Sequence, residues 1–164
     1  MNELRDTTDV GELIQYIVIK IDEEQYGINI KFIDNIVRMQ QITRVPKVDD
    51  YLKGVINIRG EIVPVMSVRM KMGLAEEEIT GKSRIIILKT SEGDLVGIIV
   101  DQVNQVLTLG ANNIEKVRYD DKKNKSSATF VSGVGHYDGG LVSILDLDAV
   151  VAEKDAKEKA ANAS

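Results

Sequence analysis

Apolar and polar positions follow the same order twice along the chain. Residues 26–37 match residues 96–107 at an offset of 70, and apolar positions 30, 33, 36 and 37 stay aliphatic at 100, 103, 106 and 107. Apolar spacing of i, i+3, i+6 and i+7 predicts a strand that ends in a helical turn with one buried face. Self-similarity of this kind indicates an internal duplication.

A second pair of matching segments follows the first. Residues 54–68 align with residues 133–147 at an offset of 79, and each predicts a hairpin, closed by Arg59-Gly60 in one copy and Asp138-Gly139-Gly140 in the other. Ser67 and Asp146 share one repeat position, where either side chain can cap a helix N-terminus. The additional residues of the second copy fall before Gly133 and include a polar run at 120–127, which predicts a surface loop.

The two copies together predict an all-β protein of two small, pseudo-repeated, five-stranded antiparallel barrels packed together, with short helical turns and a C-terminal helix. We expect one lobe over about residues 13–80 and a second over about 84–151. Residues 1–12 are predicted to be flexible, and 152–164 to form a charged tail that is helical or frayed. A unit of about 65 residues is marginal alone, so the lobes should share an interface. The sequence leaves open whether terminal strands cross between lobes.

Composition and charge narrow the class of protein. The chain has 164 residues, of which 43% are hydrophobic and 29% charged, as expected for a globular protein. Its apolar content is nearly all aliphatic, with two Phe, five Tyr and no Trp, which favours strands. The net charge of −5 and the few aromatic residues argue against nucleic-acid binding, which needs a basic groove and stacking platforms.

The sequence also indicates where in the cell the protein is expected. The N-terminal residues lack a basic stretch followed by an apolar run, so no signal peptide is predicted. Aliphatic runs are far shorter than the roughly 20 residues that a membrane-spanning helix needs. Cysteine is absent, which excludes disulfides and thiolate metal sites. We therefore expect a cytoplasmic protein with no direct membrane insertion.

Catalytic patterns are weak. His136, the one histidine, takes the repeat position of Asn57 beside a hairpin turn, where a solvated side chain is expected. A histidine base would need a nucleophile and an orienting carboxylate nearby. Glycines at 133–140 lack the Gly-Lys-Ser/Thr ending of a phosphate loop. The sequence therefore predicts no catalytic residue, no metal site and no cofactor.

Residues 51–65, Tyr-Leu-Lys-Gly-Val-Ile-Asn-Ile-Arg-Gly-Glu-Ile-Val-Pro-Val, closely resemble the central signature of the CheW family of chemotaxis coupling proteins. Further blocks resemble the family in order, at 24–28, 42–46, 96–103 and 133–147. The resemblance covers roughly residues 13–151 and implies two five-stranded barrels without enzymatic activity. It implies a scaffold in signalling arrays that couples the regulatory domain of the histidine kinase CheA to the cytoplasmic tips of methyl-accepting chemoreceptors. Other CheW copies are further possible partners.

The resemblance also implies two sets of site residues. The receptor-binding set is Ile33, Asn35, Gly54, Asn57, Arg59 and Ile86, and the kinase-binding set is Asp101, Gln102 and Val103. Many relatives carry Glu at the position of Asn35, so the corresponding ion pair with Arg59 cannot form here. Arg59 can instead be a solvated turn residue or form a local salt bridge, while Ile33, Ile86 and Val103 can equally be core residues.

Two alternatives to this function stay open. The chain could be a CheW-like coupling module of the CheV kind, although such proteins carry a receiver domain where this chain has an Ala/Lys/Glu tail. An enzyme or small-molecule sensor would instead show a deep polar pocket between the lobes, holding His136 and a carboxylate.

Overall fold

The computed structural model describes residues 11–117 and 130–152, and these residues form two β-sheets. One sheet has five strands: β3 (Ile33–Arg38), β4 (Leu52–Ile58), β5 (Glu61–Ser67), β6 (Arg84–Lys89) and β7 (Leu95–Val100). The other has six: β1 (Leu13–Ile21), β2 (Glu24–Asn29), β8 (Gln102–Gly110), β9 (Ile114–Lys116), β10 (Val131–Tyr137) and β11 (Gly140–Leu145). Short helices join them: η1 (Ile30–Phe32), η2 (Ala111–Asn113), α2 (Val68–Lys71) and α3 (Leu147–Val151).

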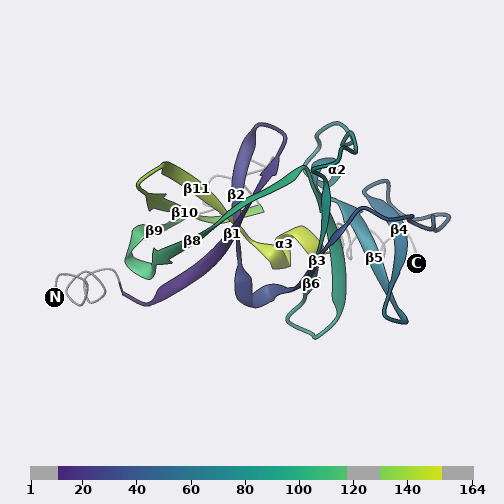
Figure 1. Ribbon diagram of the computed structural model, residues 1–164, viewed down its shortest axis with the longest axis horizontal. Helices are drawn as coiled ribbons and strands as arrows, with labels where there is room; N and C mark the ends of the chain where they lie inside the picture. The colour runs from purple at the N-terminus through teal and green to yellow at the C-terminus, as the bar shows by residue number, and fades with distance from the viewer. Residues whose placement is uncertain (1–10, 118–129, 153–164) are drawn as a thin grey trace, which may run out of the picture.

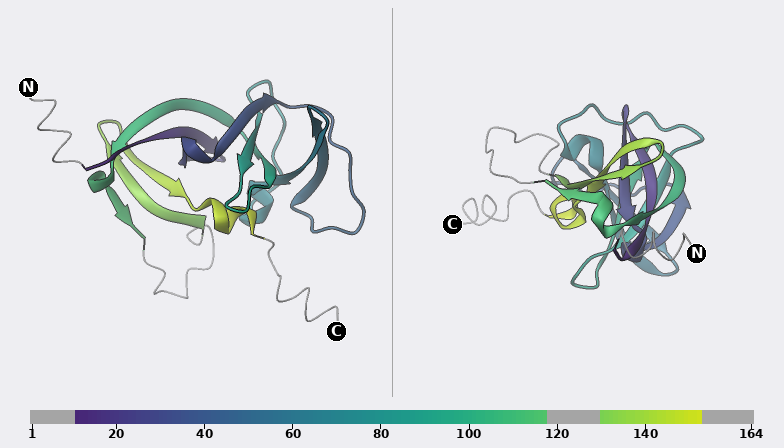
Figure 2. Two further views of the ribbon diagram at one scale, coloured as in Figure 1. Left: turned by 90° about the horizontal axis from the view of Figure 1, so that it is seen from below. Right: turned by 90° about the vertical axis from the view of Figure 1, so that its left-hand side faces the viewer.

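The two sheets lie side by side along the long axis of the molecule, with α3 at their junction (Figures 1 and 2). The strand order is β3-β6-β7-β5-β4 in one sheet and β8-β1-β2-β11-β10-β9 in the other. Neighbouring strands are antiparallel except for the β5–β7 and β2–β11 pairs, which are parallel. The prediction of an all-β protein of two pseudo-repeated units of about five strands is confirmed. The six-stranded sheet has one strand more than expected, and each sheet contains one parallel pair where only antiparallel pairs were expected.

The two repeats exchange their first hairpins. Strands β3, β4 and β5 correspond in the duplication to β8, β10 and β11, and the β1–β2 hairpin corresponds to β6–β7. However, β1–β2 lies in the sheet built by the second repeat, and β6–β7 lies in the sheet built by the first. Each sheet therefore draws strands from both expected lobes, and the boundaries 13–80 and 84–151 do not separate the two sheets.

The connections after β2 and β7 explain this exchange. A strand reverses tightly where two residues such as Asn-Gly adopt positive φ. Only η1 separates β2 from β3, and only Asp101 separates β7 from β8, and neither link contains glycine. The chain therefore runs on into the other sheet instead of folding back on its own hairpin.

The expected helical turns are largely strand. The first repeat contains only the three-residue η1, and the second passes from β7 through a bend at Asp101 into β8. The i, i+3, i+6 and i+7 spacing of apolar residues comes from β-bulges and not from helical turns. The bulges lie at Asp34 in β3 and at Asn104 in β8, where they interrupt the alternation of inward and outward side chains. Asp34 and Asn104 are equivalent in the duplication, so both repeats share this irregularity.

Three apolar clusters hold the sheets together. The inter-sheet core combines residues of both sheets, including Ile19 of β1, Ile86 of β6 and Leu145 of β11. A second cluster lies within the five-stranded sheet and a third within the six-stranded sheet. The continuous aliphatic run of β6 follows from this arrangement, because Ile85 and Ile87 join the second cluster while Ile86 and Leu88 join the inter-sheet core.

The predicted caps are confirmed. Ser67 Oγ accepts a hydrogen bond from Met70 N at 3.1 Å, and Asp146 Oδ1 accepts one from Ala149 N at 3.2 Å. Among the described residues, no helix has the length and apolar character needed to cross a membrane. The polar run at 120–127, residues 1–10 and most of the expected tail lie outside the described residues.

Candidate partner-binding surfaces

Arg59 lies at the tip of the β4–β5 hairpin, at one end of the five-stranded sheet. Its φ is +51° and that of Gly60 is +86°, as in a tight two-residue turn, and Asn57 Oδ1 accepts a hydrogen bond from Gly60 N at 2.8 Å. The Arg59 side chain is 75% exposed, and its Nη2 lies 3.7 Å from Asp34 Oδ2. The ion pair that Asn35 cannot form is thus made by its neighbour, the bulged residue of β3.

The remaining residues of the receptor-binding set divide into two groups. Ile33 is partly buried against the inter-sheet core, and Asn35 is partly buried with its Oδ1 accepting a hydrogen bond from Ile36 N at 2.8 Å. Ile86 is 0% exposed. Gly54 has a φ of +144°, and a Cβ there would overlap Thr43 O of the neighbouring segment. Ile86 and Gly54 therefore hold the sheet together, and neither presents a side chain at the surface.

Asp101, of the kinase-binding set, belongs to an internal ion-pair network that the sequence did not predict. Its Oδ2 accepts hydrogen bonds from Asp22 N at 2.7 Å and from Arg69 Nη1 at 2.9 Å. Arg69 Nη1 also lies 3.4 Å from Asp22 Oδ1, and its Nε donates to Ala75 O at 2.8 Å. The Arg69 side chain is only 16% exposed, so the network ties α2 to the β1–β2 turn and to the β7–β8 bend.

A comparison of the two repeats points to the residues of this ion-pair network. The repeat equivalents of Arg69 and Asp101 are Asp148 and Lys31, so both positions carry opposite charges in the two copies. Next to the network, Gln102 is partly exposed and Val103 packs against the inter-sheet core. Of the kinase-binding set, Gln102 is thus the residue whose side chain is neither in the ion-pair network nor packed against that core.

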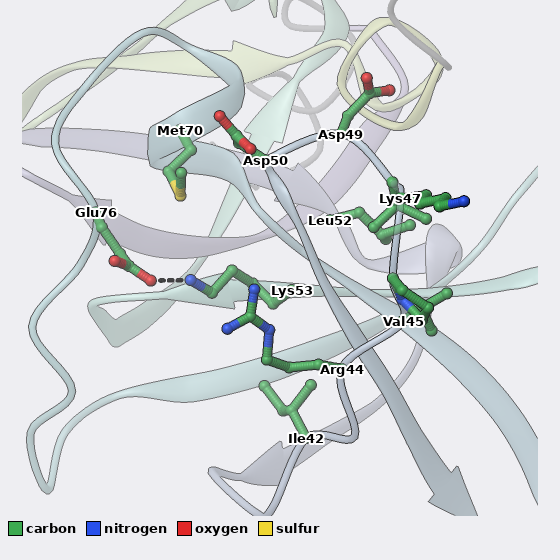
Figure 3. Close-up of a pocket in the computed structure, with 12 residues that line it drawn as sticks. Ile42, Arg44, Val45, Lys47, Asp49, Asp50, Leu52, Lys53, Met70 and Glu76 are labelled. Atoms are coloured by element: carbon green, nitrogen blue, oxygen red, sulfur yellow. Dashed lines mark ion pairs between the residues drawn. The ribbon is translucent and has the colours of Figure 1, made fainter.

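A hollow of about 780 Å³ lies between the segment that precedes β4 and the one that follows α2 (Figure 3). Arg44 and Lys53 point into it, and Lys53 forms an ion pair with Glu76 on the opposite wall. Its apolar lining includes Val45 and Met70. The described lining contains no His, Ser or Thr, and its ionisable side chains are Arg, Lys, Asp and Glu.

A smaller hollow of about 290 Å³ lies between the two sheets and is lined by residues that include Tyr16, Phe32 and Asp146. His136 lines neither hollow; its Nε2 lies 2.7 Å from Glu115 Oε1 at the surface. The expected solvated histidine therefore has a carboxylate partner. Within residues 11–117 and 130–152, no group of three His, Asp or Glu side chains is placed to hold a metal ion.

Two tyrosines of the six-stranded sheet have shifted titration. Burial raises the pKa of the Tyr16 phenol. The pKa of Tyr26 is also raised, first by burial and then by the negative charges of Glu24 and Asp22. Both shifts favour the neutral phenol in the folded protein.

These features define a class of protein: a duplicated, all-β chain whose two sheets exchange hairpins and whose two ends are related but chemically different. The chain belongs to the family of CheW-like domains, whose model matches residues 15–155. It is 33% identical to "Chemotaxis protein CheW" of Bacillus subtilis over 94% of this chain and 96% of that protein. It is 32% identical to "Chemotaxis protein CheW" of Thermotoga maritima, over 96% and 99% of the two chains.

A solved structure agrees with this membership. The crystal structure of the scaffolding protein TtCheW from Thermoanaerobacter tengcongensis is similar with a TM-score of 0.78 at 28% identity. The similarity covers 87% of this chain and 95% of that one. The two-sheet fold is therefore the fold of a known CheW scaffold.

Proposed function

We propose that this protein is a non-catalytic chemotaxis scaffold, which couples the histidine kinase CheA to the cytoplasmic tips of methyl-accepting chemoreceptors. It acts in the cytoplasm at membrane-associated receptor arrays. The observation that carries the proposal is family membership over most of the chain. The chain also has two separate candidate surfaces, at the β4–β5 hairpin tip and at the β7–β8 bend. A scaffold that binds two unlike partners needs two such surfaces.

The receptor surface lies on the five-stranded sheet. Arg59 and Asn57 supply the exposed hairpin tip, and Ile33 and Asn35 supply the neighbouring part of β3. Receptor tips are helical, so recognition follows the pattern of a helix that packs on an aliphatic surface rimmed by polar groups. Gly54 and Ile86 maintain this surface from within.

The kinase surface lies where β7 passes into β8. Gln102 makes the contact, Val103 supports it from the inter-sheet core, and Asp101 positions the bend through Arg69. Further copies of the chain are possible partners, because the β7–β8 bend has a repeat equivalent at η1 and the start of β3. Each contact is modest, and binding in an array gains from multivalency.

Co-sedimentation with receptor-containing membranes, with and without CheA, tests this function. We expect the protein to sediment with the membranes and to bring CheA with it. Arg59→Glu should weaken receptor binding about tenfold, which corresponds to about 1.4 kcal/mol, and leave CheA binding unchanged. Gln102→Lys should do the reverse.

Thermal melting of both variants verifies that they fold. Absence of sedimentation both with and without CheA would exclude the scaffold function. Equal loss of both partners in each folded variant would exclude the division into two surfaces.

A further inference from the structure

The pairing between β2 and β11 stops short of the ends of both strands. Their parallel ladder contains only the pairs Tyr26–Ser143 and Gly27–Ile144. Continued in register, it would pair Glu24 with Leu141, and both residues belong to these strands. The strands diverge instead and leave a hollow of about 460 Å³, lined by Glu23, Glu24 and Gln25 on one side and by Tyr137, Leu141 and Ser143 on the other.

At Leu141 the backbone of β11 faces this hollow without a ladder partner. A two-residue turn closes the β10–β11 hairpin, so Tyr137 and Gly140 form its first hydrogen-bonded pair. Hydrogen-bonding direction alternates along an antiparallel strand, so the N–H and C=O of Leu141 point away from β10 and toward β2. The Leu141 side chain is 62% exposed. β11 lies between β2 and β10, so this exposure is local: at Leu141 an unpaired N–H and C=O lie beside an exposed aliphatic side chain, and together they can bind another extended segment.

The five-stranded sheet provides the matched case. Its parallel ladder between β5 and β7 begins at Val65–Gly97, and Ile62, the repeat equivalent of Leu141, is 60% exposed. Pro64, however, stands where β11 has Ser143. Proline has no N–H to donate, so the β5–β7 ladder begins one repeat position later than the β2–β11 ladder, in which Ser143 already pairs with Tyr26. Ile62 does not line the hollow beside β11, so it is an equally exposed aliphatic residue that serves as the matched control.

The negative charge of the hollow favours a positively charged ligand. Glu23 and Glu24 line it, and no Lys or Arg is among the described residues of its lining. We propose that it binds an extended, basic segment of a partner protein, which adds as a strand along β11. Aliphatic side chains of the segment pack on Leu141, and its cations pair with the two glutamates.

The hollow also adjoins the candidate kinase surface. Glu23 lines both this hollow and a neighbouring one that contains Asp101 and Gln102. A strand on β11 would therefore lie beside the β7–β8 bend. The inference goes beyond the proposed function and does not depend on it, since it rests on the pairing of β2 and β11 and on the charges of the lining.

NMR titration of the full, nitrogen-15-labelled chain tests this inference. The probe is the acetylated and amidated peptide Lys-Val-Lys-Val-Lys-Val, and the control replaces each Lys with Glu. We expect the basic peptide to shift the amide signals of Leu141 and Ser143 and to slow hydrogen exchange at the Leu141 N–H. The acidic peptide should leave both unchanged.

Substitutions test which side chains bind the basic peptide. The pair Glu23→Lys and Glu24→Lys should abolish binding, and Leu141→Ala should weaken it about tenfold, while the matched Ile62→Ala should leave it unchanged. Thermal melting of each variant verifies folding. Shifts without slower exchange at Leu141, equal binding of the acidic peptide, or equal effects of Leu141→Ala and Ile62→Ala would overturn the proposal.

Discussion

The five-stranded and six-stranded sheets are two copies of one structure, and they differ in an orderly way. Both copies keep glycine at the position where another segment lies against the backbone. Thr43 lies close to Gly54 in one copy, and Glu115 lies close to Gly133 in the other. Helix caps are also retained at Ser67 and Asp146. The features that both copies share are therefore those that backbone packing and helix capping require.

The exposed tips, in contrast, have diverged. Asn57 and Arg59 stabilise and charge one hairpin, while the equivalent His136 and Asp138 give the other a different chemistry, with His136 paired to Glu115. Duplication with retained backbone and altered tips produces two surfaces of one shape and unlike charge. That difference suits a protein that holds two partners.

The largest expected difference between the sheets comes from the shared glycines. Gly54→Ala should reduce the free energy of unfolding by about 3–5 kcal/mol, because it combines a positive φ with overlap of a backbone oxygen. Gly133→Ala should cost about 1–2 kcal/mol, because its Cβ would lie 2.8 Å from Glu115 O on a short edge strand that can move. Urea unfolding measures both, and equal losses would show that the two closures are equally rigid.

A smaller difference is expected between the caps. Asp146→Ala should cost about 1 kcal/mol, the usual value of an N-cap. Ser67→Ala should cost about 2–3 kcal/mol, because Ser67 Oγ also donates to the buried Glu77 carboxylate at 2.7 Å, which would lose its partner. Urea unfolding of Ser67→Ala with and without Glu77→Gln separates the two contributions. If both caps cost the same, the Ser67–Glu77 bond adds nothing.

The smallest expected effect is a pH dependence that arises from Tyr26 of the six-stranded sheet. The pKa of Tyr26 is raised above its ordinary value of about 10, so its contribution to stability is complete below that pH and is lost as pH rises above it. Tyr26→Phe should therefore lose less stability than the unmodified protein between neutral and strongly alkaline pH. Thermal melting across that range measures this, and identical slopes would contradict it.

Much of the fold could be predicted because the duplication repeats local features. Caps, turn residues and alternating aliphatics act within a few positions, so Ser67, Asp146 and Arg59-Gly60 were recognised from neighbours alone. The exchange of hairpins could not be predicted, because both possible partners of β3 are aliphatic hairpins of the same pattern. Only the short links at η1 and Asp101 distinguish them, and their effect depends on the three-dimensional path.

The surroundings of the predicted site residues were harder to predict from the sequence. An aliphatic residue at position 86 has the same pattern whether it lies in a groove or in the core, and the structure buries it completely. The Arg59–Asp34 pair depends on a β-bulge that turns Asp34 toward the hairpin, and the Arg69–Asp101 pair joins residues of different repeats. Such contacts follow from topology, which the duplication alone does not define.

The exchange of hairpins also sets the order in which the protein can be assembled during synthesis. All strands of the five-stranded sheet have been made once Val100 has left the ribosome, whereas β1 and β2 need β8 and β11 as neighbours. Because chains fold from the N-terminus as they emerge, the first strands to be made are among the last to be completed. The β1–β2 hairpin therefore waits for its neighbours until β8 and β11 emerge, and a chain whose synthesis stops before β8 would contain all five strands of one sheet and a hairpin with no neighbouring strand.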